Sequence, residues 1–131
     1  QIEHLGIAVK DIEAGNALYT KLLGVPPYKE EVVESEGVRT SFFKAGPNKI
    51  ELLQATSPDS PIAKFIEKRG EGIHHVAYAV EDIVAEMYRL KLEGFRLLND
   101  APKAGADNKW FCFLHPKDAG GTLIELCQER S

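Results

Sequence analysis

The segment Gly72-Ile-His-His-Val-Ala-Tyr-Ala-Val-Glu-Asp-Ile83 repeats the opening of the chain. From Ile73 onward it matches Ile2-Glu-His-Leu-Gly-Ile-Ala-Val-Lys-Asp-Ile12 at six of eleven positions. One of the identical residues is a histidine, His4 in the first copy and His75 in the second. Because internal repeats constrain the architecture more strongly than any local pattern, the sequence predicts two related halves.

A second pair of segments repeats near the end of each half. Gly46-Pro-Asn-Lys-Ile-Glu-Leu-Leu-Gln54 matches Gly120-Gly-Thr-Leu-Ile-Glu-Leu-Cys-Gln128 at five of nine positions. The shared ionisable residue is a glutamate, Glu51 in the first copy and Glu125 in the second. Each half is therefore expected to open with a histidine strand and to close with a glutamate strand.

The length of the chain allows one domain. With 131 residues, the two halves are each too small to fold alone and are expected to share one core. We predict a single domain over residues 1–131. It would comprise a first module at 1–55, a linker with a short helix at 56–72 and a second module at 73–131.

Composition and charge exclude several classes of partner. A hydrophobic content of 44% indicates a globular protein, and a net charge of −4 provides no basic field to attract nucleic acid or an anionic membrane. No apolar run approaches the length of a membrane span. The two cysteines, Cys112 and Cys127, lie in apolar runs, and we expect them to be reduced core residues. The expected compartment is the cytoplasm, or the mitochondrial matrix of a eukaryote after removal of a targeting segment.

The first half has the pattern of a strand, a helix and three more strands. Asp11 is a typical helix N-cap and Gly24 a typical stop, and apolar residues recur between them at helical spacing. This pattern predicts a helix over residues 12–23. Strands are predicted at residues 2–9, 28–35, 38–44 and 49–55. The expected unit is βαβββ.

The second half follows the same scheme after the linker. Ser60 followed by Pro61 is a typical helix start, so a short helix is expected there. A further helix should begin after Asp82 and reach about Glu93. Residues 99–108 form the longest irregular stretch, and such loops often carry binding. Strands are expected near residues 73–80, 95–98, 109–114 and 122–128.

The repeated histidines and glutamates point to a metal site. Imidazole nitrogen and carboxylate oxygen are common ligands of divalent transition metals, and two halves related by a pseudo-twofold axis would bring all four side chains together. A single histidine or glutamate on a strand usually has a structural role. A histidine and a glutamate that both recur at equivalent positions of the two halves favour a metal site. A site with open positions and no thiolate suits Co, Mn, Ni, Fe or Zn acting as a Lewis acid. The four expected ligands are His4, Glu51, His75 and Glu125.

Other polar residues have weaker signals. His74 should point to the opposite face of its strand from His75, so a structural role is expected. His115, before Pro116, is expected in a loop. The cations around the long loop are either a solvated rim or contacts to a polyphosphate tail, assisted by backbone amides near Gly105 and Gly120-Gly121. These cations are Arg96, Lys103, Lys109 and Lys117.

Tandem βαβββ halves with His/Glu strands resemble the vicinal oxygen chelate superfamily, which includes glyoxalase I, extradiol dioxygenases and bleomycin-resistance proteins. Within this superfamily the chain is similar to the methylmalonyl-CoA epimerases. The segments that carry the similarity occur in the right order across nearly the whole chain. They are His4-Leu-Gly-Ile-Ala-Val9, Asp59-Ser-Pro-Ile-Ala-Lys-Phe65, Gly70-Glu-Gly-Ile-His-His75, Phe113-Leu-His-Pro-Lys117 and Gly120-Gly-Thr-Leu-Ile-Glu-Leu126.

The resemblance implies an α+β fold in which tandem βαβββ modules form one cleft-shaped sheet. It implies that the four expected ligands hold a divalent ion, Co²⁺ first and otherwise Mn²⁺, Ni²⁺ or Zn²⁺. The small residues lining the cleft would be Gly6, Ala8, Ala77 and Ala79. The implied reaction interconverts (R)- and (S)-methylmalonyl-CoA by removing and returning the C2 proton through a metal-stabilised enolate. An acyl-CoA substrate and a homodimer are also implied, with no nucleic acid and no membrane partner.

Inversion requires an acid/base group on each face of the enolate. The resemblance implies Glu125 as the first. Some family members carry a glutamate on the third strand, where this chain has Thr40, and a threonine cannot act as a base at neutral pH. Glu51 or a metal-bound water is therefore expected to be the second. The residues expected to contact substrate are Lys103, Gly105, Lys109, His115 and Lys117.

Three rival functions use the same fold. Glyoxalase I isomerises a glutathione hemithioacetal with the same four ligands, and a substrate assay distinguishes it. A non-catalytic ligand-sequestering protein has no need of two matched His/Glu pairs, so metal content distinguishes it. An extradiol dioxygenase normally uses two histidines and one carboxylate around ferrous iron in a longer chain, which disfavours it here.

Overall fold

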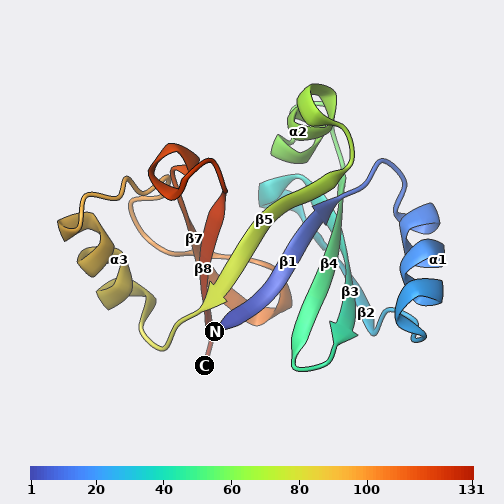
Figure 1. Ribbon diagram of the computed structural model, residues 1–131, viewed down its shortest axis with the longest axis horizontal. Helices are drawn as coiled ribbons and strands as arrows, with labels where there is room; N and C mark the ends of the chain where they lie inside the picture. The colour runs from blue at the N-terminus through green and yellow to red at the C-terminus, as the bar shows by residue number, and fades with distance from the viewer. The chain divides into compact units, whose positions relative to one another are not determined.

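The structure, a computed structural model, describes residues 1–131 (Figure 1). Two compact units can be distinguished: His4–His74, and Gln1–Glu3 together with His75–Ser131. The first residues of the chain belong with the second half, since the backbone N–H of Ala79 donates to the carbonyl of Gln1 over 2.8 Å. Each half contains the predicted βαβββ order, so the predicted α+β fold of tandem modules is confirmed.

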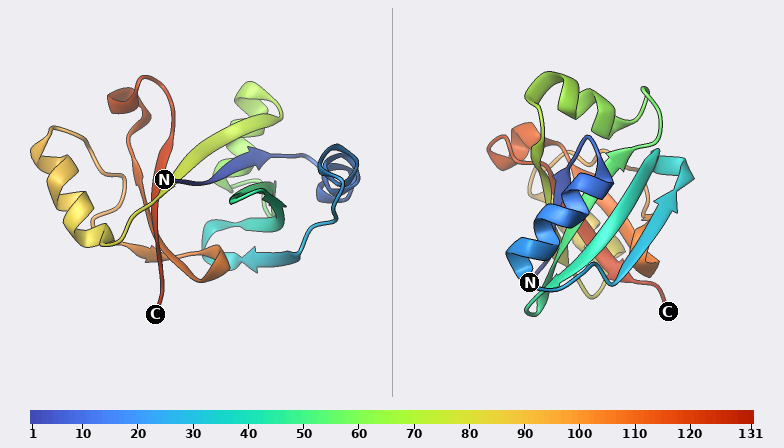
Figure 2. Two further views of the ribbon diagram at one scale, coloured as in Figure 1. Left: turned by 60° about the horizontal axis from the view of Figure 1, so that its bottom comes forward. Right: turned by 90° about the vertical axis from the view of Figure 1, so that its right-hand side faces the viewer.

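The first half is a four-stranded sheet with a helix along one face (Figures 1 and 2). The strand order is β2-β3-β4-β1, and β1 runs parallel to β4 while the other pairs are antiparallel. The elements are β1 (Ile2–Ala8), α1 (Ile12–Leu23), β2 (Lys29–Val33), the 3₁₀ helix η1 (Glu34–Glu36), β3 (Val38–Ala45) and β4 (Asn48–Ala55).

Helix α1 has the limits that its sequence predicts. The Asp11 side chain accepts a hydrogen bond from the backbone N–H of Glu13, as an N-cap does, and Gly24 ends the helix with φ 76°. Buried Ile12 and Phe43 belong to the core between α1 and the sheet. Successive side chains of a strand point to opposite faces of the sheet. His4 and Glu51 therefore lie on the face opposite α1.

The linker forms α2 (Pro61–Arg69), with Pro61 in its first turn and Ser60 as its N-cap, as predicted. The Ser60 hydroxyl accepts from the backbone N–H of Ile62 over 3.2 Å. Ile62 packs with Ala8 and Leu53. These two residues share the sheet face of His4 and Glu51, so α2 covers one end of that face.

The second half has the strand order β5-β8-β7-β6, with β5 parallel to β8. Helix α3 packs on one face through Ile83, Met87 and Leu90, which meet Cys112 and Leu126. The elements are β5 (Gly72–Ala79), α3 (Ile83–Leu92), β6 (Lys103–Ala104), the 3₁₀ helix η2 (Ala106–Asn108), β7 (Lys109–Leu114), the 3₁₀ helix η3 (Pro116–Ala119) and β8 (Ile124–Glu129).

The predicted strand at residues 95–98 is wrong. Only Leu97 forms a bridge, with Leu114, and the apolar alternation of Phe95 and Leu97 is explained by packing against the α3 core. Conversely, the stretch at 99–108 is not wholly irregular, because β6 pairs with β7 inside it. The strand predicted at 28–35 is shorter, since Glu34 starts η1.

In each half, a glutamine at an equivalent position fixes the start of the long helix. The Gln54 Oε1 atom accepts from the backbone N–H of Ile12 over 2.6 Å, and Gln128 Oε1 accepts from that of Ile83 over 2.7 Å. The first N–H groups of a helix have no partner within the helix, so each glutamine ties a helix to the end of the closing strand of its half. The two glutamines are equivalent positions of the sequence repeat.

Replacing Gln54 by alanine is expected to lower the free energy of unfolding by about 1 kcal/mol, because the N–H of Ile12 loses its acceptor. Urea unfolding at equilibrium measures the change. Gln54→Glu keeps an acceptor oxygen and serves as the matched control. A Gln54→Ala variant as stable as the control would contradict the role of this hydrogen bond.

No helix of the structure is sufficiently long and apolar to cross a membrane. Cys112 and Cys127 are both free and buried, as the sequence predicts.

Candidate metal centre

In the first half, His4 and Glu51 form a buried pair on adjacent strands. The His4 Nδ1 atom lies 3.1 Å from Glu51 Oε2, and the two residues are only 4% and 6% exposed. The parallel register sets Gly6 beside Glu51, and His4 lies two residues before Gly6, so both side chains leave the same face. That face is the one opposite α1.

The second half builds the same pair from its own strands. The His75 Nε2 atom lies 3.0 Å from Glu125 Oε1, and the residues are 5% and 8% exposed. Ala77 is beside Glu125 in the parallel register, and His75 lies two residues earlier. The Phe113 ring meets the His75 ring edge-on, with centroids 5.6 Å apart, and restricts the imidazole.

Neighbouring residues of the two pairs also correspond. Phe42 is the antiparallel partner of Glu51, and Phe113 is the antiparallel partner of Glu125. Gly6 and Ala77, the equivalent small residues two places after each histidine, are both buried. The sequence repeat is thus a repeat of three-dimensional side-chain arrangement within each half.

The donors of each pair suit a divalent transition metal. Each pair offers one imidazole nitrogen, a borderline ligand, and one carboxylate oxygen, a hard ligand. The nearby Cys112 packs in the core under α3 and is not placed as a ligand, and burial, and then the charge of Glu125, raise the pKa of its thiol to about 11. The Cys127 Sγ atom instead donates to the carbonyl of Tyr78. The residues present therefore fit a metal held by nitrogen and oxygen.

Thr40 lies on the same face of the first sheet as Glu51. It is two residues from Phe42, the strand partner of Glu51, and only 1% exposed. A neutral hydroxyl at this position can accept or donate a hydrogen bond but cannot hold the proton that a carboxylate would take.

The residues predicted to contact substrate lie in the second half. Lys109 is buried, and its Nζ atom is in an ion pair with Glu129. Gly105 has a packing reason to be glycine, because a Cβ atom there would come within 2.7 Å of the Phe111 ring. Lys103 is exposed on β6.

His115 and Lys117 belong to the turn that precedes β8. The His115 Nδ1 atom accepts from the backbone N–H of Lys117 over 3.2 Å and so caps η3. Arg96 anchors the same turn through two hydrogen bonds of 2.9 Å to Asp118. These bonds lower the pKa of the Asp118 carboxyl to about 2. Arg96 is therefore an anchor of the turn, while the Lys117 side chain is exposed.

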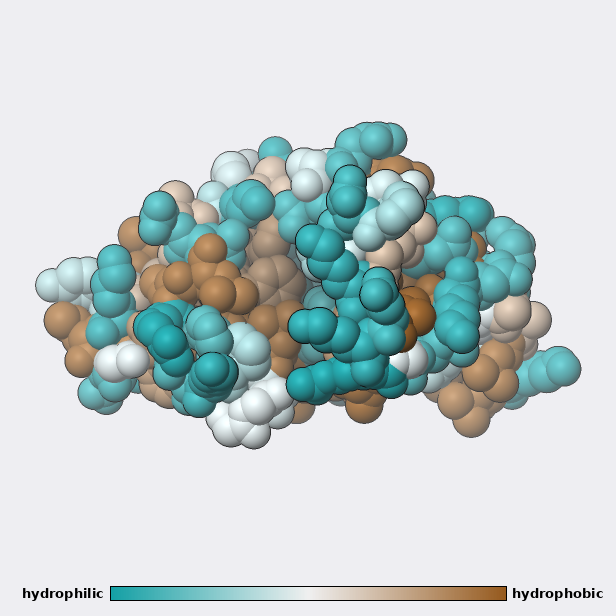
Figure 3. Space-filling view, turned by 90° about the horizontal axis from the view of Figure 1, so that it is seen from above, coloured by the Kyte–Doolittle hydropathy of each residue, from teal (hydrophilic) through white to brown (hydrophobic).

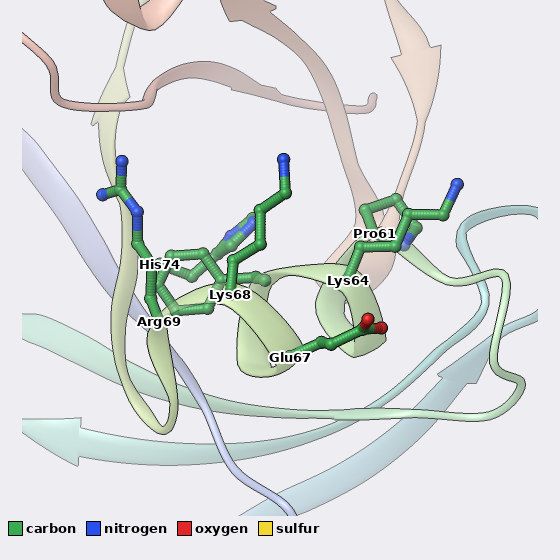
Figure 4. A pocket seen from close by; sticks show the side chains of 7 residues that line it. Pro61, Lys64, Glu67, Lys68, Arg69 and His74 are labelled. Carbon is green, nitrogen blue, oxygen red and sulfur yellow. The ribbon is translucent and has the colours of Figure 1, made fainter.

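Sequence reasoning missed a basic hollow on α2. Its lining includes Lys64, Lys68 and Arg69 together with His74 (Figure 4). His74 has a packing role, as expected, since its ring meets that of Phe65 edge-on with centroids 5.0 Å apart. The four-residue spacing of the two lysines along a short amphipathic helix is the signal that could have located this cluster.

Comparison with known proteins places these features in a family. The family model described as the Glyoxalase/Bleomycin resistance protein/Dioxygenase superfamily matches residues 3–113. The chain is 45% identical over 130 residues to the ethylmalonyl-CoA/methylmalonyl-CoA epimerase of Cereibacter sphaeroides, covering 98% of this chain and 97% of the relative.

Solved structures of related proteins are similar to this chain along nearly its whole length. A hypothetical protein from Bacillus halodurans C-125 is 41% identical with a TM-score of 0.96, covering 100% of this chain and 95% of the other. A methylmalonyl-CoA epimerase variant from Streptomyces coelicolor, in complex with 2-nitronate-propionyl-CoA, is 36% identical with a TM-score of 0.95. That alignment covers 98% of this chain and 94% of the other.

Proposed function

Because the chain belongs to the glyoxalase/bleomycin resistance protein/dioxygenase superfamily, we propose that it is an epimerase that interconverts (R)- and (S)-methylmalonyl-CoA. The observation that carries this proposal is the near full-length similarity to a named epimerase in a chain whose halves each bury a His–Glu pair. Superfamily membership alone does not identify the substrate. The similarity to epimerases indicates that the substrate is a 2-substituted malonyl thioester.

The reaction requires a proton to leave C2 of the substrate and return on the opposite side. The thioester and the carboxylate on either side of C2 both draw electron density from it, so the proton can be removed by a carboxylate if the developing negative charge is stabilised. The protein must therefore supply charge stabilisation and an acid/base group on each side of the substrate.

We propose that the His4–Glu51 and His75–Glu125 pairs together form one divalent metal site. The matched chemistry and burial of the two pairs support this arrangement, and neither pair alone supplies more than two side-chain ligands. A bound divalent ion supplies Lewis-acid stabilisation of the negative charge that develops on the substrate oxygens. Co²⁺ is the proposed ion, with Mn²⁺, Ni²⁺ and Zn²⁺ as alternatives.

Glu125 is the proposed first acid/base. Its carboxylate is buried beside His75, on the closing strand of the second half. Glu51 is the proposed second group, because it is the corresponding carboxylate of the other half and Thr40 on the same face cannot take a proton. The Phe42 and Phe113 rings beside the two glutamates make the surroundings apolar.

The remaining parts of the proposal concern substrate contacts and assembly. The proposed contacts of the acyl-CoA are Lys103, Gly105, Lys109, His115 and Lys117. The Lys109 ammonium would have to exchange its bond with Glu129 to serve in this way. We further propose a homodimer in the cytoplasm or mitochondrial matrix.

Exchange of the C2 proton tests the function. The metal-loaded protein is mixed with a single enantiomer of methylmalonyl-CoA in deuterated buffer, and loss of the C2 proton signal and of optical purity are followed together. We expect both, at rates proportional to enzyme concentration. Protein that binds a divalent ion but causes no exchange would refute the proposal, and turnover of the glutathione hemithioacetal would then identify a glyoxalase.

A further inference from the structure

The hollow on α2 is lined mainly by cationic and aromatic side chains. It has a volume of about 380 Å³ and is lined by Pro61, Lys64, Phe65, Glu67, Lys68, Arg69 and His74. Three cations and one carboxylate give it a local charge of 3 − 1 = +2 with His74 neutral, in a chain whose net charge is −4. Figure 3, which views the molecule from the side where α2 lies in Figure 1, shows hydrophilic side chains gathered over this region.

The cations of the hollow are available to a ligand. Lys64, Lys68 and Arg69 are exposed and form no ion pair or side-chain hydrogen bond. Elsewhere in the first half, Arg39 pairs with Glu30 over 2.8 Å and Lys29 with Glu31 over 3.5 Å. Figure 4 shows the Lys68 and Arg69 side chains extending to one side of α2, whereas the carboxylate of Glu67 points away.

A favourable helix dipole is the simplest alternative reason for two of these charges. Lys68 and Arg69 lie in the last turn of α2, where cations stabilise a helix. This reason does not apply to Lys64, which lies in the first half of the helix, and it does not account for a hollow. The aromatic rings of Phe65 and His74 also line it, and aromatic rings are surfaces on which nucleobases stack.

We propose that this hollow binds the phosphorylated nucleotide end of the acyl-CoA substrate. The proposal rests on the proposed epimerase function, which supplies a substrate with an adenine ring and phosphate groups. Lys64, Lys68 and Arg69 contact the phosphates, and the adenine lies against the Phe65 and His74 rings. Because Ile62 of the same helix packs on Ala8 and Leu53, α2 stands at one end of the sheet face that carries His4 and Glu51. The flexible pantetheine arm joins the two places.

Removing two of the cations tests the site. The variant Lys68→Ala/Arg69→Ala is expected to raise KM for methylmalonyl-CoA about tenfold, because two exposed charge-assisted contacts are lost. Its kcat should be unchanged, and so should its KM for methylmalonyl-pantetheine, which lacks the nucleotide. Lys21→Ala/Lys91→Ala removes the same charge from exposed positions of α1 and α3 and is the matched control. Glu67→Gln should lower KM about twofold, an effect that damage to α2 could not produce.

Direct binding separates this inference from the function. Adenosine 3′,5′-bisphosphate is titrated calorimetrically into the wild-type protein and each variant, without turnover. Binding that weakens in Lys68→Ala/Arg69→Ala, in a protein that exchanges no C2 proton, would support the nucleotide site and refute the epimerase. Unchanged KM and unchanged bisphosphate binding in this variant would overturn the inference while leaving the function intact. So would loss of affinity only in Lys103→Ala/Lys117→Ala, or inorganic phosphate binding as tightly as the bisphosphate.

Discussion

Glu125→Gln is expected to slow C2 proton exchange by about 10²- to 10⁴-fold, the usual contribution of a positioned general acid or base. Glutamine has nearly the same shape as glutamate and keeps an oxygen facing His75, so the fold and the packing against Phe113 should be retained. It cannot accept a proton. The initial rate of exchange in deuterated buffer measures the loss.

The matched control is Glu81→Gln, which makes the same chemical change at an exposed position between β5 and α3. It should retain the wild-type rate. A Glu125→Gln variant with more than about a tenth of the wild-type exchange rate would exclude Glu125 as the principal acid/base, given the contribution expected of such a group.

Comparison of the two substrate enantiomers extends this test to Glu51. If the carboxylates act on opposite sides of C2, Glu51→Gln and Glu125→Gln should each slow exchange more for one enantiomer than for the other, with opposite preference. If Glu51→Gln slows exchange equally for both enantiomers, Glu51 acts only as a metal ligand. The second acid/base would then have to be a water molecule, because Thr40 cannot take that role.

Removal of the metal is the second large expected effect. Protein stripped with a chelator should lose nearly all exchange activity, by at least about 100-fold, because the negative charge on the substrate oxygens would no longer be stabilised. Addition of Co²⁺ should restore it. A stripped protein, verified by elemental analysis, that keeps its activity would refute metal dependence.

Metal stoichiometry tests the proposal that the two pairs form one site. We expect one ion per chain and a rise in unfolding temperature, since an ion present at 100 times its Kd adds about 2.7 kcal/mol to the free energy of unfolding. His4→Ala and His75→Ala should each abolish this rise, whereas His115→Asn should keep it. Two ions per chain, each lost with a different histidine, would show two separate sites.

Local sequence rules predicted most of the elements, because their causes are local. The helix at 12–23 needs only Asp11 and Gly24 at its ends and apolar residues at helical spacing. The start of α2 needs only Ser60 and Pro61. The strand expected at 95–98 was wrong for a tertiary reason, since the apolar residues there pack on α3 without forming a ladder. Periodicity records which residues are buried and not what buries them.

The sequence by itself determined the repeat, the βαβββ order and the two His/Glu pairs, because identical residues at equivalent positions of two copies need no coordinates to be recognised. Only the tertiary structure decided which atoms meet, with Nδ1 of His4 but Nε2 of His75 toward its glutamate. It also decided that Lys109 is paired while Lys64, Lys68 and Arg69 are not. Partners such as Glu129 for Lys109 come from other strands, and side-chain pairing across strands depends on register and rotamer, which residue spacing along one segment does not specify.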